Sequence, residues 1–180
     1  MPGKTPQLAL DNYLHPLRQS LACVTNCQFA YTSARPNLES LLTLSEPTAA
    51  LLSQEGVEFW LSFQHNYKIQ VSGRGYKVTT LSYRYGIEDC EHNEIMLYHW
   101  HPKSRVVLPH IHIPCAGVVR PELDKAHMPT LRIAFEDFLF CLITEFHIEA
   151  NENYENILTA NRKAFREHSS WIYGDELIRL

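Results

Sequence analysis

Residues 94–114 read EIMLYHWHPKSRVVLPHIHIP and contain two His-x-His pairs, His99/His101 and His110/His112. In an extended strand, residues two apart point to the same face. Each pair is therefore predicted to project both imidazoles to one side. If the two segments pair antiparallel about a connection centred near residues 105–106, His101 lies opposite His110 and His99 opposite His112. Four imidazoles would then share one surface.

The chain before this stretch alternates in the same way. Apolar and polar residues alternate over residues 57–64 and 76–85, as they do in half-buried strands. The intervening Ser72-Gly73-Arg74-Gly75 has the composition of a turn, with glycines that can take positive φ. Together with the histidine segments, these patterns predict an antiparallel meander of four to five strands.

Helical patterns flank the predicted sheet. Residues 133–146 carry apolar side chains at three- and four-residue spacing, with two carboxylates in the first turn, where the helix dipole favours anions. A second C-terminal helix is predicted from about residue 151. Before the sheet, residues 8–21 predict a helix interrupted at His15-Pro16. Residues 37–52 predict a further helix with Asn37 as its N-cap.

This order predicts an α+β fold, in which N-terminal helices and two C-terminal helices pack on one face of an antiparallel meander sheet. The other face is expected to be at least partly open. Residues 1–56 are predicted as an N-terminal helical segment, and residues 57–180 as the α+β domain that carries the histidines. The two parts are expected to form one compact unit.

Composition narrows the class of protein. The 180 residues are 45% hydrophobic and 20% charged, which is typical of a globular chain. The net charge of −4 provides no overall electrostatic footprint for nucleic acid. Because there is neither a long apolar run nor a secretory leader pattern, we expect a cytoplasmic protein without a membrane partner. Five scattered cysteines with no C-x-x-C pair argue against a disulfide framework or a zinc knuckle.

Paired imidazoles indicate acid–base chemistry, because an unperturbed imidazole exchanges protons near neutral pH. RNA cleavage without a metal or cofactor uses such a pair, with cations on the phosphate and aromatic rings against the bases. Taken singly, each of these partners is better explained as part of a solvated face or of the core. The predicted substrate-binding residues are Arg74, Arg84, Arg105, Arg132, Tyr83 and Tyr85.

A metal site is the alternative interpretation of the same four histidines. Neutral imidazoles bind zinc, copper or nickel, and Glu94 or Asp89 could support them. His127 is either a further member of the site or a loop residue. The other five histidines, which lie in predicted helices or turns, are interpreted as non-catalytic: His15, His65, His92, His147 and His168.

Three runs together resemble TumE-type proteins, small bacterial proteins that form the toxin half of toxin–antitoxin pairs. The runs are LYHWH (97–101), PHIH (109–112) and HMPTLRIAFEDFL (127–139). The likeness covers residues 67–165, whereas the segment before Val57 has no counterpart and the chain is longer than is typical. The resemblance implies a toxin-like role through RNA and a cognate antitoxin as partner. The matching positions are His99, His101, His110, His112 and Arg132.

The leading hypothesis is therefore a TumE-like, metal-independent endoribonuclease that uses the paired histidines. A metal-dependent hydrolase at the four-histidine cluster is the first alternative. The second is a protein-binding module, in which the open sheet face and residues 171–180 engage a partner and the histidines are incidental. Formation of a homo-oligomer is compatible with all three.

Overall fold

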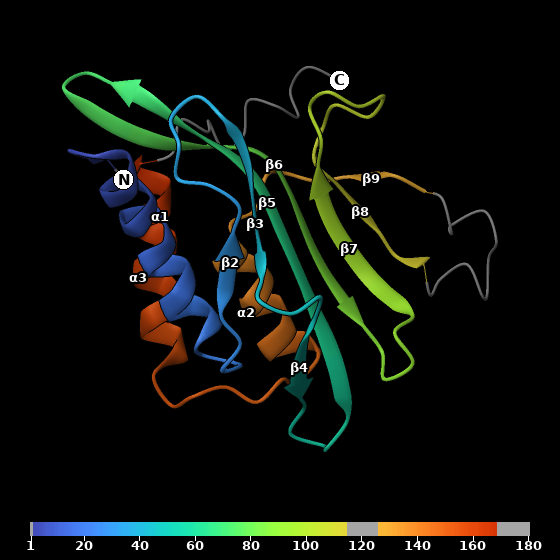
Figure 1. Cartoon of the computed structure of the whole chain (residues 1–180). Coiled ribbons are helices and arrows are strands. Elements are labelled where there is room, and N and C mark those ends of the chain that lie inside the picture. Colours follow the sequence, from blue (N-terminus) through green and yellow to red (C-terminus); the bar gives the residue numbers. More distant parts are fainter. Residues whose placement is uncertain (1, 115–125, 169–180) are drawn as a thin grey trace.

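The computed structural model describes residues 2–114 and 126–168, which form an antiparallel sheet with helices (Figure 1). The α+β class predicted from the sequence is confirmed. The elements, in chain order, are β1 (Pro2–Gly3), α1 (Pro6–Leu21), β2 (Phe29–Tyr31), β3 (Glu39–Leu44), β4 (Ala49–Leu52), β5 (Glu58–Ser72), β6 (Gly75–Glu88), β7 (Glu94–Trp100), β8 (His110–His112), β9 (Met128–Pro129), α2 (Phe135–Glu145) and α3 (Tyr154–His168).

The long hairpin of β5 and β6 organises the sheet. Its strands have 15 and 14 residues and are joined at the predicted turn, where Gly73 has a φ of 59°. The strand order is β2-β3-β5-β6-β7-β8-β9, with β1 paired to β6 and β4 paired to β5. Sequential hairpins thus carry the chain from β5 to β8, which confirms the predicted meander. The sheet has nine strands in the described residues, because the N-terminal part adds strands of its own.

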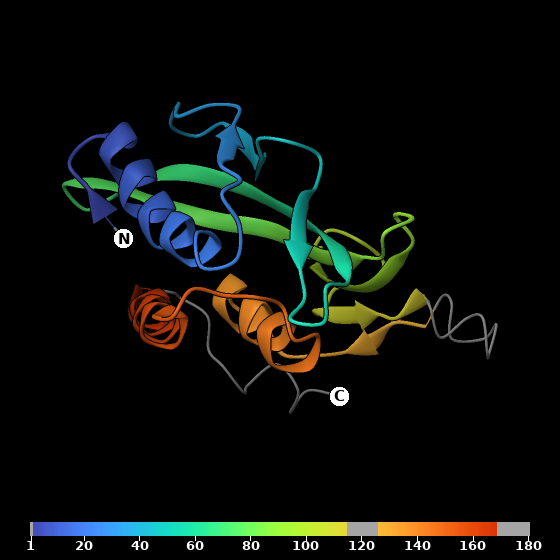
Figure 2. The same ribbon diagram turned by 90° about the horizontal axis from the view of Figure 1, so that it is seen from below.

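The three helices of the described residues lie on one side of the sheet (Figure 2). Their buried side chains, among them Leu10, Leu14 and Phe138, join aromatic residues of β5 and β6 in a shared core. Full burial of a side chain of this size contributes about 1.5–3 kcal/mol. Because α1 and the C-terminal helices share this core, residues before and after position 57 form one packed body.

Residues 37–52 are not helical, and the prediction of a helix there is wrong. They form β3 and β4, and the buried residues alternate along both strands. The run of leucines at 41–44 fits either period, and pairing with β5 selects the strand. Asn37 has a φ of 60°, which does not suit an N-cap, and its N–H donates to the Ile69 carbonyl instead.

Helix α1 continues through His15-Pro16, so the predicted break is also wrong. A proline inside a helix costs about 3 kcal/mol. Pro16 is buried, and its carbonyl accepts hydrogen bonds from Ser20 Oγ at 2.8 Å and from Asn161 Nδ2 at 3.0 Å. Packing of α1 against the sheet and α3 offsets the cost. The helix begins as expected for a capped end, because Thr5 Oγ1 accepts from the Leu8 N–H.

His65 was predicted to lie in a helix or turn, and this prediction is wrong because it lies in a strand and in the core. His65 of β5 is 2% exposed. Its Nδ1 lies 2.6 Å from the Tyr13 hydroxyl, and its Nε2 lies 2.6 Å from the Tyr85 hydroxyl. Burial lowers the pKa of His65 to about 3, so the ring is neutral. Each of its two nitrogens has a tyrosine hydroxyl as hydrogen-bond partner.

Residues 169–180 lie outside the described residues, and so does the predicted partner-binding tail at 171–180. The same holds for Cys115, whereas Cys23, Cys27, Cys90 and Cys141 are free thiols. None of the described helices has both the length and the apolar character needed to cross a membrane.

Candidate metal centre

Strands β7 and β8 pair antiparallel, with His99 opposite His110 and Leu97 opposite His112. The predicted register placed His99 opposite His112, so it is wrong by two residues. The turn forms early in the connection, where the Ser104 N–H donates to the His101 carbonyl at 2.9 Å, and not near residues 105–106. A shift of two residues preserves the side to which each residue points. The four predicted histidines therefore still share one face.

This face is the one turned away from the helices. Across β6, β7 and β8, Arg84 lies beside His99, which lies beside His110. The intervening residues point the other way. Tyr98, for example, meets the Phe138 ring of α2 edge to face, with the ring centroids 5.9 Å apart. Alternation along β7 thus places aromatic residues against the core and imidazoles on the opposite side.

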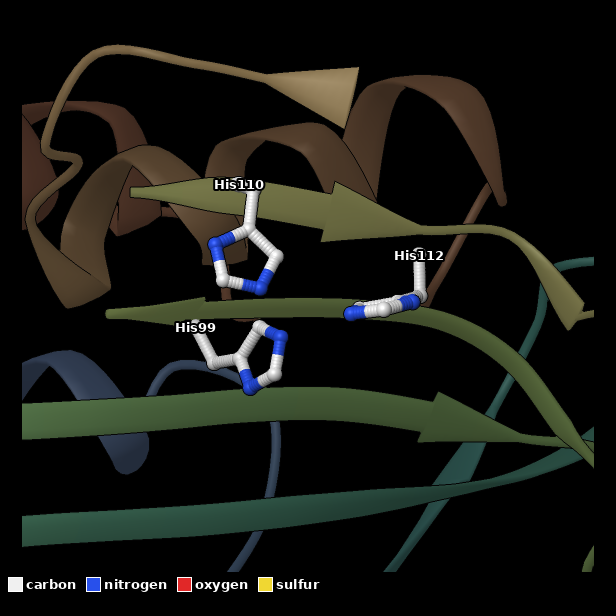
Figure 3. A group of neighbouring side chains, drawn as sticks. All are labelled: His99, His110 and His112. Carbon is white, nitrogen blue, oxygen red and sulfur yellow. The ribbon is translucent and has the colours of Figure 1, made fainter. Parts of the chain in front are cut away.

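Three of the rings converge, as Figure 3 shows for His99, His110 and His112. One nitrogen from each lies within 4.8 Å of the others. The centroid of the His99 ring is 4.1 Å from that of His110 and 4.7 Å from that of His112. Zinc–nitrogen bonds of 2.0–2.1 Å place two ligands of a tetrahedral site about 3.4 Å apart, so small side-chain rotations would close the triangle.

Hydrogen bonds occupy Nδ1 of both His110 and His99, which leaves Nε2 of each ring as the candidate metal ligand. His110 Nδ1 lies 2.8 Å from the Leu108 carbonyl, which can only accept, so Nδ1 carries the proton and Nε2 carries the lone pair. His99 Nδ1 lies 2.9 Å from His101 Nε2. His99 Nε2 is buried and has no hydrogen-bond partner among the described residues. A buried polar atom without a partner is costly, and a bound ligand is one way to satisfy it.

The electrostatics keep these rings neutral. Desolvation and the neighbouring imidazoles, His110 foremost, lower the pKa of His99 to about 3. Desolvation is also the largest cause of the lowered pKa values of His101, His110 and His112. Neutral imidazole is the form that binds a metal. A general acid at pH 7, by contrast, needs a protonated ring.

A fifth histidine, His127, joins the cluster from the position directly before β9. The pairing of Ile111 with Met128 and of His110 with Pro129, continued by one residue, places His127 opposite His112. The centroid of the His127 ring is 4.4 Å from that of His112 and 4.8 Å from that of His110. The sequence could not place His127, because β9 has only two residues and gives no alternating pattern. The signal that was available is the short His-x-Pro run, which follows a stretch of sequence without a periodic pattern.

Of the predicted phosphate-binding residues, Arg84 lies on the histidine face. Its guanidinium contacts Glu94 Oε2 at 2.5 Å, so this carboxylate pairs with arginine and does not support the imidazoles. Asp89 instead accepts hydrogen bonds from the Asn93 side chain and backbone. Arg105 is exposed in the β7–β8 connection.

The remaining predicted contacts lie elsewhere. Arg74 is in the β5–β6 turn, ten residues before Arg84, which corresponds to roughly 30 Å along a strand. Tyr83 and Tyr85 are each 1% exposed and stack on one another in the core, which does not fit a role in binding bases. The Arg132 guanidinium lies 3.6 Å from the centroid of the Trp100 ring, on the helix side of the sheet.

Comparison of the chain with protein-family models, curated proteins and solved structures found no match. The resemblance to TumE-type proteins therefore stays a prediction. The class of site rests on the geometry of the histidine cluster.

Proposed function

We propose that His99, His110 and His112 bind a divalent transition metal, zinc in the first place, and that the centre serves metal-assisted hydrolysis. The buried, unpartnered Nε2 of His99 carries this proposal. It lies in a group whose three ligand nitrogens are within 4.8 Å of one another, each on a neutral imidazole. Three protein ligands with one open position are typical of catalytic zinc sites.

The residues around the three ligands would hold them in place. The Leu108 carbonyl fixes the tautomer of His110. With His99 Nε2 as the metal ligand, His99 Nδ1 would donate to His101 Nε2, 2.9 Å away. Such outer partners orient metal-binding imidazoles and increase their basicity. When bound, zinc would lower the pKa of a coordinated water to about 7 and so supply a nucleophile at neutral pH.

Metal-independent RNA cleavage by the same histidines has less support, because the lowered pKa values disfavour the protonated ring that a general acid needs. A toxin-like role, RNA as substrate and a cognate antitoxin stay predictions from the resemblance. A metal-dependent hydrolase could itself act on RNA, so substrate class and metal dependence are separate questions. The protein-binding alternative predicts full partner binding after all four histidines are replaced.

The test uses the full chain, purified without a histidine tag and stripped of metal. We expect one Zn²⁺ per chain by titration and elemental analysis, and loss of this site in His99→Ala and in His110→Ala. His15→Ala is the matched control, because His15 is an exposed imidazole on α1, away from the cluster. Zn²⁺ affinity that is equal in wild type and His99→Ala would contradict the proposal.

Activity is tested next, on ester, phosphodiester and RNA substrates with and without Zn²⁺. We expect hydrolysis that needs the metal and is lost in His110→Ala. RNA cleavage that persists in metal-free wild type but not in His110→Ala would favour the metal-independent ribonuclease instead.

A further inference from the structure

Strand β9 is attached to the sheet by few contacts. It comprises only Met128 and Pro129, which pair with Ile111 and His110 of β8. Beyond the strand, the Thr130 N–H donates to the Pro109 carbonyl at 2.9 Å. Proline is typical of edge strands, because it cannot donate to a ladder. So short a ribbon is stable only with additional contacts.

The residue directly before this strand faces the histidine cluster. His127 lies opposite His112, and its ring is in contact range of both His112 and His110. The His127 side chain is exposed, whereas His110 is 2% exposed. Strands β7 and β8 and the residue directly before β9 therefore contribute imidazoles to one side of the sheet. The outermost of these imidazoles, that of His127, is the most accessible to solvent.

We propose that His127 is a fourth, displaceable ligand of the metal and that it joins edge strand β9 to the centre. The inference rests on the proposed metal site. His99, His110 and His112 come from β7 and β8 and leave one position of a tetrahedron. The His127 ring approaches this group from the side of β9. With His127 bound, four imidazoles close the site; with His127 withdrawn, water or a substrate oxygen takes the position.

This arrangement would couple metal binding to the order of one segment. Residues 130–134 connect β9 directly to the start of α2, where Phe135 is buried in the core. A metal ligand at position 127 and the core anchor at position 135 would hold both ends of this connection. We expect slower hydrogen exchange at the Met128 and Thr130 amides in the zinc-loaded protein than in the metal-free protein.

The decisive experiment places a thiol at the proposed ligand position. His127→Cys is loaded with Co²⁺, and its spectrum is compared with that of Co²⁺-loaded wild type, which subtracts the natural cysteines. Met128→Cys is the matched control, because successive residues of a strand point to opposite faces. We expect a thiolate-to-cobalt charge-transfer band in His127→Cys and none in Met128→Cys.

The absence of that band in a His127→Cys protein that still binds Co²⁺ would overturn the inference and leave the three-histidine site standing. If wild type binds no Co²⁺, the proposed site itself fails. A second variant measures affinity. We expect Zn²⁺ binding to weaken roughly 10–100-fold in His127→Ala, the range for loss of a group that supports a metal, and to be lost in His99→Ala. Unchanged affinity and unchanged hydrogen exchange in His127→Ala would also overturn the inference.

Discussion

His65 and His99 lie on opposite faces of the same sheet, and burial is the largest cause that lowers the pKa of each ring to about 3. They differ in their hydrogen bonds. His65 has a tyrosine hydroxyl on each nitrogen, whereas His99 has a buried Nε2 without a partner among the described residues. A lowered pKa alone therefore does not mark a functional histidine. The feature on which the proposed metal site rests is instead the unpartnered Nε2 beside other ligand groups.

The largest effect is expected for His65 in the core. Replacement with alanine leaves a cavity and breaks both hydrogen bonds to tyrosine, so His65→Ala should lower the free energy of unfolding by about 3–5 kcal/mol. Urea denaturation of the metal-free protein measures this. His15→Ala, at an exposed position of α1, should change stability by less than about 0.5 kcal/mol. A loss below about 1 kcal/mol for His65→Ala would contradict the structural role of His65 that distinguishes it here from His99.

Glu136 is the next test, because it too has a buried oxygen without a hydrogen-bond partner among the described residues. Unlike His99, it belongs to no group of potential metal ligands in the part of the chain that the structure describes. Burial raises its pKa to about 7, with a hydrogen bond from Ser20 acting in the opposite direction. The folded chain therefore holds the proton between pH 4.5 and 7, where the unfolded chain has lost it. Stability from this group is complete below pH 4.5 and is lost as the pH rises through 7.

Over that window, up to about 3 kcal/mol of stability should disappear in wild type. Glu136→Gln should lack this component, which denaturation at several pH values can measure. Equal pH dependence in the two proteins would mean that Glu136 is ionised in the folded state.

Zinc should distinguish the two histidines directly. At a free concentration of 100 times the dissociation constant, a ligand that binds only the folded chain stabilises it by about 2.7 kcal/mol. We expect this gain in wild type and in Tyr13→Phe, which alters only the His65 network, and no gain in His99→Ala. Thermal unfolding with and without Zn²⁺ is the measurement. An equal gain in His99→Ala would place the zinc elsewhere.

The smallest effect concerns a single hydroxyl. The Tyr13 hydroxyl lies 2.6 Å from His65 Nδ1 and 2.9 Å from Thr80 Oγ1, so Tyr13→Phe should cost about 1–2 kcal/mol. His99→Ala in metal-free protein should cost less, because it removes the buried, unpartnered Nε2 together with the contact between His99 Nδ1 and His101 Nε2. If denaturation shows the reverse order, His99 is a structural residue.

Sequence patterns predicted the elements whose periodicity is long and regular. The alternation from Val57 to Trp100 and the apolar spacing before Phe146 gave strands and a helix that the structure confirms. Residues 37–52 were assigned wrongly, because the run Leu41-Leu42-Thr43-Leu44 fits both periods and only pairing with β5 decides between them. That pairing joins residues far apart in sequence, which local patterns do not record.

The sequence also predicted only part of the candidate site. Two-residue spacing placed each histidine pair on one side of its strand. The proposed register put both pairs on the same side, and its error of two residues left that side unchanged. The stacked pair Tyr83 and Tyr85 was assigned to the wrong environment, because alternation shows that two residues share a face but not which face is covered. His127 depended on β9, whose two residues follow a segment without a pattern.

Pro129 affects whether a strand of another molecule can pair with the sheet at β9. Because the Thr130 N–H points toward β8, alternation along the backbone directs the edge of Pro129 outward. A strand from another molecule that approached this rim would find no N–H to pair with at that position. Among the described residues, proline at this edge therefore disfavours extension of the sheet by a strand of another molecule.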